Sequence, residues 1–283
     1  MDVIVNADDL GISSEVNEAI FALMERGKVT SATIIANGPN VEEACAQVSR
    51  FPQYSFGAHL NITEFKPLTG HKSLEPLQDT NGELVEARIR QTSIDSALSE
   101  GIFQEFCAQI ERLQSLGISI SHVDSHNYAL TIPKMLPILK RVERRFKIGK
   151  ARITRNIYSD GLLGRSGLTS HALSVDPELG DRDVSRSVRI KKWAYNFLLR
   201  KYVGMKTTDG FSGFRLFYES AKDRRLSHRT FEVNVHPAST YYDAGEEEIV
   251  QGAWTDGIRF PIRLISYNDL GLTRHGNWND ATG

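Results

Sequence analysis

Short apolar runs alternate with longer amphipathic segments along this chain, and this alternation constrains its fold more than any other feature. Residues 3–6 form a short apolar run, Ser13 and Ser14 follow as possible helix N-caps, and an apolar stripe over residues 16–24 stops at Gly27. These residues therefore predict a strand followed by a helix, which is one βα unit. Repeated βα units are typical of helices packed around a parallel sheet, so the sequence predicts an α/β fold.

The same alternation continues to the end of the chain and predicts seven or eight strands. Besides residues 3–6, the predicted strands cover residues 31–36, 55–60, 118–123, 151–154, 206–208, 231–235 and 262–266. The predicted helices after the first cover residues 41–48, 97–116, 133–145 and 188–202. No repeat of fixed period is visible, so we expect a single barrel-like domain over residues 1–283.

Two segments are too long to be simple connections between a strand and a helix. Residues 64–92 are rich in Pro, Gly and polar side chains, and residues 159–186 are rich in Gly and Ser without a clear period. We expect both to be loop insertions near the functional site.

The charge balance argues against some classes of partner. Lys and Arg total 34 against 35 Asp and Glu, so no overall field attracts nucleic acid or an anionic membrane. The basic pair Lys191-Lys192, beside Trp193 and Tyr195, is interpreted as the solvated face of a packed helix. No apolar run approaches the roughly 20 residues that span a bilayer. The sequence therefore predicts a cytoplasmic protein with neither a nucleic-acid nor a membrane partner.

The two cysteines are predicted to be ordinary core thiols. Cys45 and Cys107 lie in predicted helices with apolar neighbours, and neither belongs to a CxxC motif or another ligand spacing. We expect both to be reduced.

Polar clusters occur where four predicted strands end. These clusters are Asn6-Ala7-Asp8-Asp9, His59-Leu60-Asn61, His122-Val123-Asp124-Ser125-His126, and the stretch from Glu232 to His236-Pro237. In parallel α/β barrels the carboxyl ends of the strands face the active site. We therefore expect these side chains to meet.

The adjacent carboxylates of Asp8 and Asp9 point to a cation. Two neighbouring carboxylates raise each other's pKa unless a cation neutralises them or one remains protonated. One carboxylate and two neutral imidazoles form a metal-ligand set that leaves positions open for water and substrate. Asp9, His59 and His126 are the predicted metal ligands.

Simpler interpretations exist for each of these residues. An Asp-Asp pair is often a solvated turn or an N-cap, and His59 could be a core histidine. His122 and His126 could be a strand histidine and a turn histidine that is hydrogen-bonded to Asp124. The recurrence of such residues at three strand ends favours the metal site. Outside these clusters, the remaining histidines are predicted to lie at the surface: His71, His171, His228 and His275.

These motifs resemble those of the YdjC-like (ChbG-like) carbohydrate deacetylases, which open with Asn-Ala-Asp-Asp-Phe-Gly and carry His-x-Asp-Ser-His in the middle. Here the motifs are Asn6-Ala7-Asp8-Asp9-Leu10-Gly11 and His122-Val123-Asp124-Ser125-His126. Three further matches follow the same order along the chain: Val29-Thr30-Ser31-Ala32-Thr33, Gly57-Ala58-His59-Leu60 and Glu232-Val233-Asn234-Val235-His236-Pro237.

The resemblance implies a distorted (β/α) barrel, similar to a TIM barrel and related to NodB-type polysaccharide deacetylases. It implies removal of the acetyl group from an N-acetylated sugar by a metal-dependent hydrolase, with magnesium or zinc bound by Asp9, His59 and His126. Asp8 would be the base that activates water, and His236 the acid that protonates the leaving amine. Glu232 would either orient these groups or act as a structural partner on its strand.

Other outcomes remain open from the residues themselves. The same ligands would serve a metal-dependent hydrolase of another amide, an ester or a phosphate, and they accept zinc, magnesium, cobalt, nickel or manganese. A sugar-binding protein that has lost catalysis is a further alternative. Asn127-Tyr128 replaces the additional histidine that usually follows in the family, which predicts an altered substrate wall. A homodimer is a possible assembly.

Overall fold

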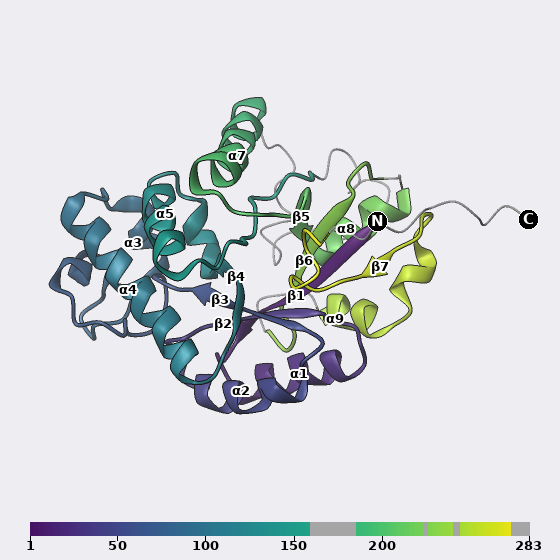
Figure 1. The fold of residues 1–283 in the computed structure, drawn as a ribbon, viewed down its shortest axis with the longest axis horizontal. Coiled ribbons are helices and arrows are strands. Elements are labelled where there is room, and N and C mark those ends of the chain that lie inside the picture. The colour runs from purple at the N-terminus through teal and green to yellow at the C-terminus, as the bar shows by residue number, and fades with distance from the viewer. Residues whose placement is uncertain (159–184, 224–225, 240–243, 273–283) are drawn as a thin grey trace, which may run out of the picture.

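Every pairing between the named strands is parallel, so all their carboxyl ends lie at one edge of the sheet (Figure 1). The computed structural model describes residues 1–158, 185–223, 226–239 and 244–272. Within these ranges seven strands form one sheet in the order β4-β3-β2-β1-β6-β5, and β7 lies beside the first residues of β1. The strands are β1 (Asp2–Leu10), β2 (Ser31–Ile34), β3 (Ser55–Leu60), β4 (Ile120–Ser125), β5 (Gly210–Gly213), β6 (Thr230–Val235) and β7 (Arg263–Leu264).

Helices surround the strands in Figure 1. Their bounds are α1 (Ser14–Glu25), α2 (Val41–Gln47), α3 (Glu86–Gln91), α4 (Ser96–Ser115), α5 (Met135–Phe146), α7 (Arg186–Leu198), α8 (Phe214–Asp223) and α9 (Ala244–Gln251). The predicted N-cap of α1 is present, because Ser13 Oγ accepts a 3.2 Å hydrogen bond from the Val16 amide. Asp95 caps α4 in the same way, at 2.8 Å from the Leu98 amide.

The short helical turns complete the connections. They are η1 (Val48–Arg50), η2 (Lys72–Leu77), η3 (His126–Thr131), the π-helical turn η5 (Leu199–Val203) and η6 (Trp254–Gly257). Because η2 and α3 both lie within residues 64–92, this predicted insertion has regular structure of its own. Most of the other predicted insertion, residues 159–186, lies outside the described residues.

An extended segment, residues 150–156, links the two edge strands of the sheet. The Arg152 amide donates to the Val123 carbonyl of β4 at 3.1 Å, and the Asn156 amide donates to the Phe211 carbonyl of β5 at 3.3 Å. The sheet is therefore curled, and the prediction of a distorted α/β barrel is confirmed.

Two predicted strands are wrong, since residues 151–154 and 206–208 form only isolated bridges rather than ladders. For residues 151–154 the reason is a side chain that takes the place of a strand partner. Asn196 of α7 accepts a hydrogen bond from the Thr154 amide at 2.9 Å and donates one to the Thr154 carbonyl at 3.1 Å. The backbone at this position is satisfied without a neighbouring strand.

The sequence patterns missed β5, which begins and ends with glycine, and α8, which follows it directly. Glycine weakens a strand prediction, yet at Gly210 it is required by packing: a Cβ there would lie 2.2 Å from the Phe231 ring. The last strand was predicted over residues 262–266 and is only two residues long, Arg263–Leu264.

The core fills the space between the sheet and the helices. Ile20, Phe106 and Phe231 are among its fully buried side chains. Cys45 and Cys107 are buried in it and unpaired, as predicted. None of the described helices is long and apolar enough to cross a membrane.

Candidate active site

The three predicted metal ligands meet at the carboxyl edge of the sheet. Asp9 is the last residue but one of β1, His59 lies in β3, and His126 follows β4. One donor atom from each lies within 4.8 Å of the others. The Asp9 Oδ1 atom is 2.9 Å from His126 Nδ1 and 3.3 Å from His59 Nε2. All three residues are buried. A small cation could therefore bind between them.

A bulge in β1 allows Asp8 and Asp9 to serve the same site. Consecutive strand residues normally point to opposite faces of a sheet. The register between β1 and β2 shifts between Ala7 and Leu10, and Asp9 has a left-handed φ of 69°. Aspartate tolerates this conformation better than most residues, and bulges commonly redirect side chains beside active sites. The distortion places both carboxylates among the histidines.

In both imidazoles, the ring nitrogen that does not face Asp9 contacts another carboxylate. His59 Nδ1 lies 2.6 Å from Asp124 Oδ1, and His126 Nε2 lies 2.8 Å from Glu64 Oε2. Burial lowers the pKa of both histidines, but Asp124 raises that of His59 to about 10, and Asp9 raises that of His126 to about 9. Carboxylates behind ligand imidazoles are a common feature of metal sites, where they fix the ring orientation.

Arg152 neutralises a second group of carboxylates below the histidines. It forms two hydrogen bonds of 2.7 Å with Asp8, one contact of 2.8 Å with Asp124 and one of 2.7 Å with Glu232. Burial raises the pKa of Asp8, but the guanidinium outweighs it and holds that pKa below its ordinary value. Asp8 is therefore ionised at neutral pH.

A second set of possible ligands, Asp8 with His59 and Asp124, is less suited to a metal. Both carboxylates of this set already bind the Arg152 guanidinium. For Asp9, in contrast, the ion-pair partners within the described part of the chain are the imidazoles of His59 and His126. Among the described residues, the first set is the one whose carboxylate still lacks a permanent cation.

His236, the predicted acid, follows β6 and lies beside Asp8. Its Nε2 atom is 3.6 Å from Asp8 Oδ2. Burial lowers the pKa of His236 despite the opposing effect of Asp8, so its imidazole is neutral at pH 7. The structure brings together all five predicted site residues: Asp8, Asp9, His59, His126 and His236.

His122 does not join this group. Its ring stacks on Tyr267 with 3.6 Å between centroids, and it packs so closely against Gly57 that a Cβ there would lie 2.5 Å from it. Of the two simpler interpretations, the strand histidine holds for His122. The alternative in which His126 is hydrogen-bonded to Asp124 does not hold, because Asp124 binds His59 and the ring of His126 contacts Asp9 and Glu64.

Glu232 lies beneath the site rather than in it. It accepts hydrogen bonds from Arg152 and from the Tyr267 hydroxyl, and burial raises its pKa to about 7 despite Arg152. Its contacts fit the structural alternative. Of the other histidines, His71 is exposed and His228 is half-buried against Phe231, while His171 and His275 lie outside the described residues.

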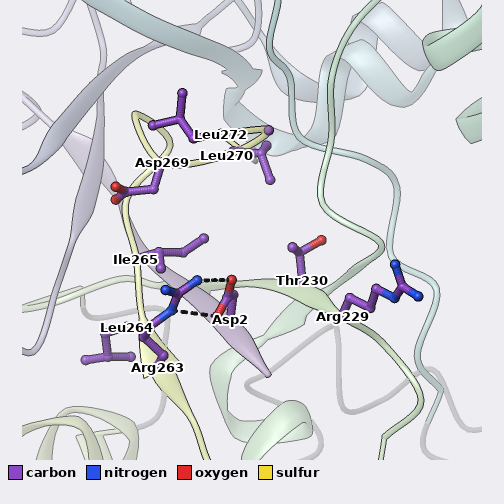
Figure 2. Close-up of a pocket in the computed structure, with 10 residues that line it drawn as sticks. Asp2, Arg229, Thr230, Arg263, Leu264, Ile265, Asp269, Leu270 and Leu272 are labelled. Carbon is purple, nitrogen blue, oxygen red and sulfur yellow. Dashed lines mark hydrogen bonds and ion pairs between the residues drawn. The ribbon is translucent and has the colours of Figure 1, made fainter. Parts of the chain in front are cut away.

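Among the described residues, two of the cavities lie toward opposite ends of the strands. One of about 500 Å³ surrounds the first residues of β1, where Figure 2 shows the ion pair between Asp2 and Arg263, and no predicted site residue lines it. The other, of about 430 Å³, is lined by Tyr128, two residues after His126 in the sequence, and by Thr154, and no predicted site residue lines it either. The second lies toward the carboxyl ends of the strands, since Tyr128 follows β4.

The wall of this second cavity has unusual backbone geometry. Asn127 and Tyr128 both have left-handed φ angles, 49° and 54°, immediately after His126. Successive non-glycine residues in this region are strained, and such strain often accompanies functional sites. Arg90 of α3 binds the Asn127 carbonyl at 2.9 Å.

A family model described as "YdjC-like protein" matches residues 2–255. The chain belongs to the YdjC-like family. Its curated relatives include carbohydrate deacetylases of Vibrio campbellii, 35% identical over 149 residues, and of Geobacillus stearothermophilus, 35% identical over 145 residues. These alignments cover 52% and 51% of this chain and 57% of each relative, so the chain spans just over half the length of the curated relatives it matches.

A solved structure shows the same fold as this YdjC-like chain. It comes from Enterococcus faecalis V583 and is named provisionally as a cellobiose-phosphate cleavage protein. The two superpose with a TM-score of 0.69 at 22% identity, over 95% of this chain and 98% of the other.

Sequence reasoning missed two residues that contact the site. Arg152 stands in a short apolar run, where a lone arginine near several acidic strand ends is a signal that could have been noticed. Glu64 lies in the long insertion after β3, and nothing in its local sequence indicates that it reaches His126.

Proposed function

We propose that this YdjC-like chain is a metal-dependent hydrolase that removes the acetyl group from an N-acetylated sugar. One observation supports it most strongly: two adjacent carboxylates have different partners. Asp9 lies between the imidazoles of His59 and His126, whereas Asp8 binds Arg152 and approaches His236. Because their partners differ, Asp9 is available to bind a metal and Asp8 is available to transfer a proton.

The donors that surround Asp9 fit a divalent cation. One carboxylate oxygen and two imidazole nitrogens suit zinc and related ions, and the buried carboxylates of Asp124 and Glu64 would orient the rings. When bound, such an ion polarises an acyl oxygen and lowers the pKa of water. Asp9, His59 and His126 are the residues proposed to hold it.

Asp8 is proposed to accept the proton from the attacking water. Its low pKa makes it a weak base but keeps it ionised at every working pH, and Arg152 fixes its orientation. As the water oxygen bonds to the acetyl carbon, the proton moves to Asp8 Oδ2, and the bond between carbon and nitrogen then breaks.

His236 is proposed to deliver a proton to the leaving amine. Its neutral imidazole lies 3.6 Å from Asp8 Oδ2, so a small movement would allow it to receive the proton from Asp8 and pass it on. The products are acetate and the free amine of the sugar, and Asp8 is ionised again.

The cavity of about 430 Å³ that Tyr128 lines is proposed to receive the sugar. Tyr128 and Tyr195 line it, and aromatic side chains pack well against the apolar faces of sugar rings. The names of the curated relatives support a carbohydrate substrate.

The experiment is to measure acetate release from N-acetylglucosamine, its dimer and other N-acetylated sugars. The protein is first stripped of metal and then supplied with zinc, magnesium, cobalt, nickel or manganese in turn. Acetate that appears only with metal supports the proposal. Metal binding without acetate from any sugar would favour hydrolysis of another amide, an ester or a phosphate. Failure to bind any of these ions would overturn it.

A further inference from the structure

Exposed apolar side chains are concentrated on one helix. Seven large apolar side chains are exposed among the described residues, and all except Leu272 lie on α7 and the turn η5 that follows it. These six are Val188, Ile190, Trp193, Phe197, Leu198 and Tyr202. In Figure 1, α7 stands at the periphery of the molecule, away from the sheet.

The most exposed of these residues form a stripe on the side of α7 that faces away from the protein. The packed side is fixed by Tyr195, whose hydroxyl donates to the Leu130 carbonyl, and by Asn196, which binds Thr154. Ile190, Trp193 and Phe197 follow at helical spacing on the opposite side, with exposures of 65%, 67% and 47%.

The stripe has a defined shape, because the rings of Trp193 and Phe197 are stacked with 5.8 Å between centroids and 19° between planes. A stacked pair of large rings exposed to water costs free energy that a binding partner would recover. Within the described residues no other segment covers this side of α7, as the exposures show.

Positive charge surrounds the stripe. Residues 186–203 contain six cations and neither Asp nor Glu, although the whole chain has a net charge of −1. The six are Arg186, Arg189, Lys191, Lys192, Arg200 and Lys201. The balanced total therefore conceals a strongly basic helix, and its partner must be anionic or tolerant of positive charge.

We propose that α7 binds peripherally to an anionic lipid surface, with Ile190, Trp193 and Phe197 inserted at the level of the headgroups. A basic helix with a stripe of aromatic and aliphatic side chains is the type that lies in a membrane interface. Anionic headgroups would pair with the cations of α7. The apolar stripe would lie at the boundary between the headgroups and the acyl chains.

Two other partners fit less well. A second copy of this chain, joined through α7 around a twofold axis, would bring two sets of six cations together without an acidic residue from either helix. A nucleic acid would match the cations but would leave the aliphatic side chain of Ile190 and much of the stripe without an apolar contact.

Binding through α7 would place the candidate substrate cavity close to the lipid. Val188, Lys191 and Tyr195 of α7 line that cavity from the other side of the helix. The binding proposal itself does not depend on the proposed reaction, and its test uses no measurement of activity.

The experiment is sedimentation of the full chain with vesicles of phosphatidylcholine, either pure or mixed with phosphatidylglycerol. Wild-type protein should pellet with the mixed vesicles, less so at high salt, and should remain soluble with the pure ones. The double variant Trp193→Glu, Phe197→Glu should lose this binding, whereas Leu272→Glu, a change of an equally exposed apolar residue elsewhere, should retain it. Arg186→Ser and Lys201→Ser should each weaken binding about fivefold.

Thermal unfolding of each variant controls for loss of structure, and light scattering measures the oligomeric state. Absence of wild-type binding to the mixed vesicles, or undiminished binding by the folded double variant, would overturn the proposal. A wild-type dimer that the double variant dissociates, without vesicle binding by either protein, would assign the stripe to a second copy instead.

Discussion

Arg152 binds Asp8 through two parallel hydrogen bonds, from Nη1 to Oδ2 and from Nη2 to Oδ1, both 2.7 Å long. Its remaining contacts join Asp124 and Glu232. One buried guanidinium thus compensates three buried carboxylates and connects β1, β4 and β6 beneath the candidate site. Paired contacts of this kind fix orientation as well as charge, which a lysine could not do with its single ammonium group.

Replacement of Arg152 by glutamine is expected to destabilise the fold strongly. The change leaves several buried carboxylates without their cation, and breaking such a network costs about 3–5 kcal/mol. Denaturant unfolding would measure the loss. The matched control is Arg112→Gln, which breaks the exposed 3.4 Å pair with Glu42 and should cost less than about 1 kcal/mol. Equal stability of the two variants would contradict the role given to Arg152.

The variants Asp8→Asn and Asp9→Asn are expected to differ although the residues are adjacent. Asp9→Asn should lose metal binding and acetate release together, because it removes the proposed carboxylate ligand. Asp8→Asn should still bind metal but lose about 10²–10⁴-fold in turnover, the usual contribution of a general base. Calorimetric titration with zinc and an acetate assay separate the two effects. Full activity of Asp8→Asn would show that another group accepts the proton.

Glu64→Gln tests the link between the long insertion and the metal site. Loss of the carboxylate behind His126 Nε2 should weaken metal binding about 10–100-fold, as is usual for partners of ligand histidines. Because Glu64 is half-exposed, with 46% of its side chain accessible, the fold should be retained. Glu75→Gln, in the same insertion, is the control. Unchanged zinc affinity in the Glu64 variant would mean that His126 needs no such support.

The metal-free protein is expected to lose stability as the pH rises above neutral. The pKa values of His59 and His126, about 10 and about 9, lie above the ordinary value of 6.5. Their protonation therefore stabilises the fold fully below about pH 6.5, and this contribution disappears as the pH rises through 9 and 10.

Melting temperatures measured across this range, with and without zinc, would test the expectation. Metal competes with protons for the imidazoles, so the increase in melting temperature on adding zinc should grow with pH. The control for other titrating groups is a double variant, His59→Gln with His126→Gln. Its melting temperature should depend less steeply on pH than that of the wild-type protein. The same slope in both proteins would exclude the histidines as its cause.

The sequence predicted the residues at the strand ends because those positions follow from topology. Asp9, His59 and His126 each follow or end an apolar run, and in a parallel sheet these ends share one edge. The clusters were therefore expected to meet, and the structure brings them within reach of one another. The helix N-cap at Ser13 was visible for a similar reason, since it depends only on neighbouring residues.

Other features depend on contacts between distant segments and could not be predicted in this way. Arg152 reaches its carboxylates only because residues 150–156 lie between β4 and β5, whereas the sequence pattern predicts an ordinary strand over residues 151–154. The short strand β5 is hidden by its glycines, one of which is required by Phe231. The bulge at Asp8 and Asp9 has no sequence signal that the patterns of strand alternation would detect.

That bulge has a consequence for how such a site can change. Since the proposed base and the proposed ligand share a peptide bond, covalent geometry rather than packing sets their separation, and any shift of β1 moves them together. Residues that line the cavity, such as Tyr128 and Thr154, belong to other segments and can vary independently. A chain built in this way can exchange one substrate for another over evolutionary time while its reacting groups keep their spacing.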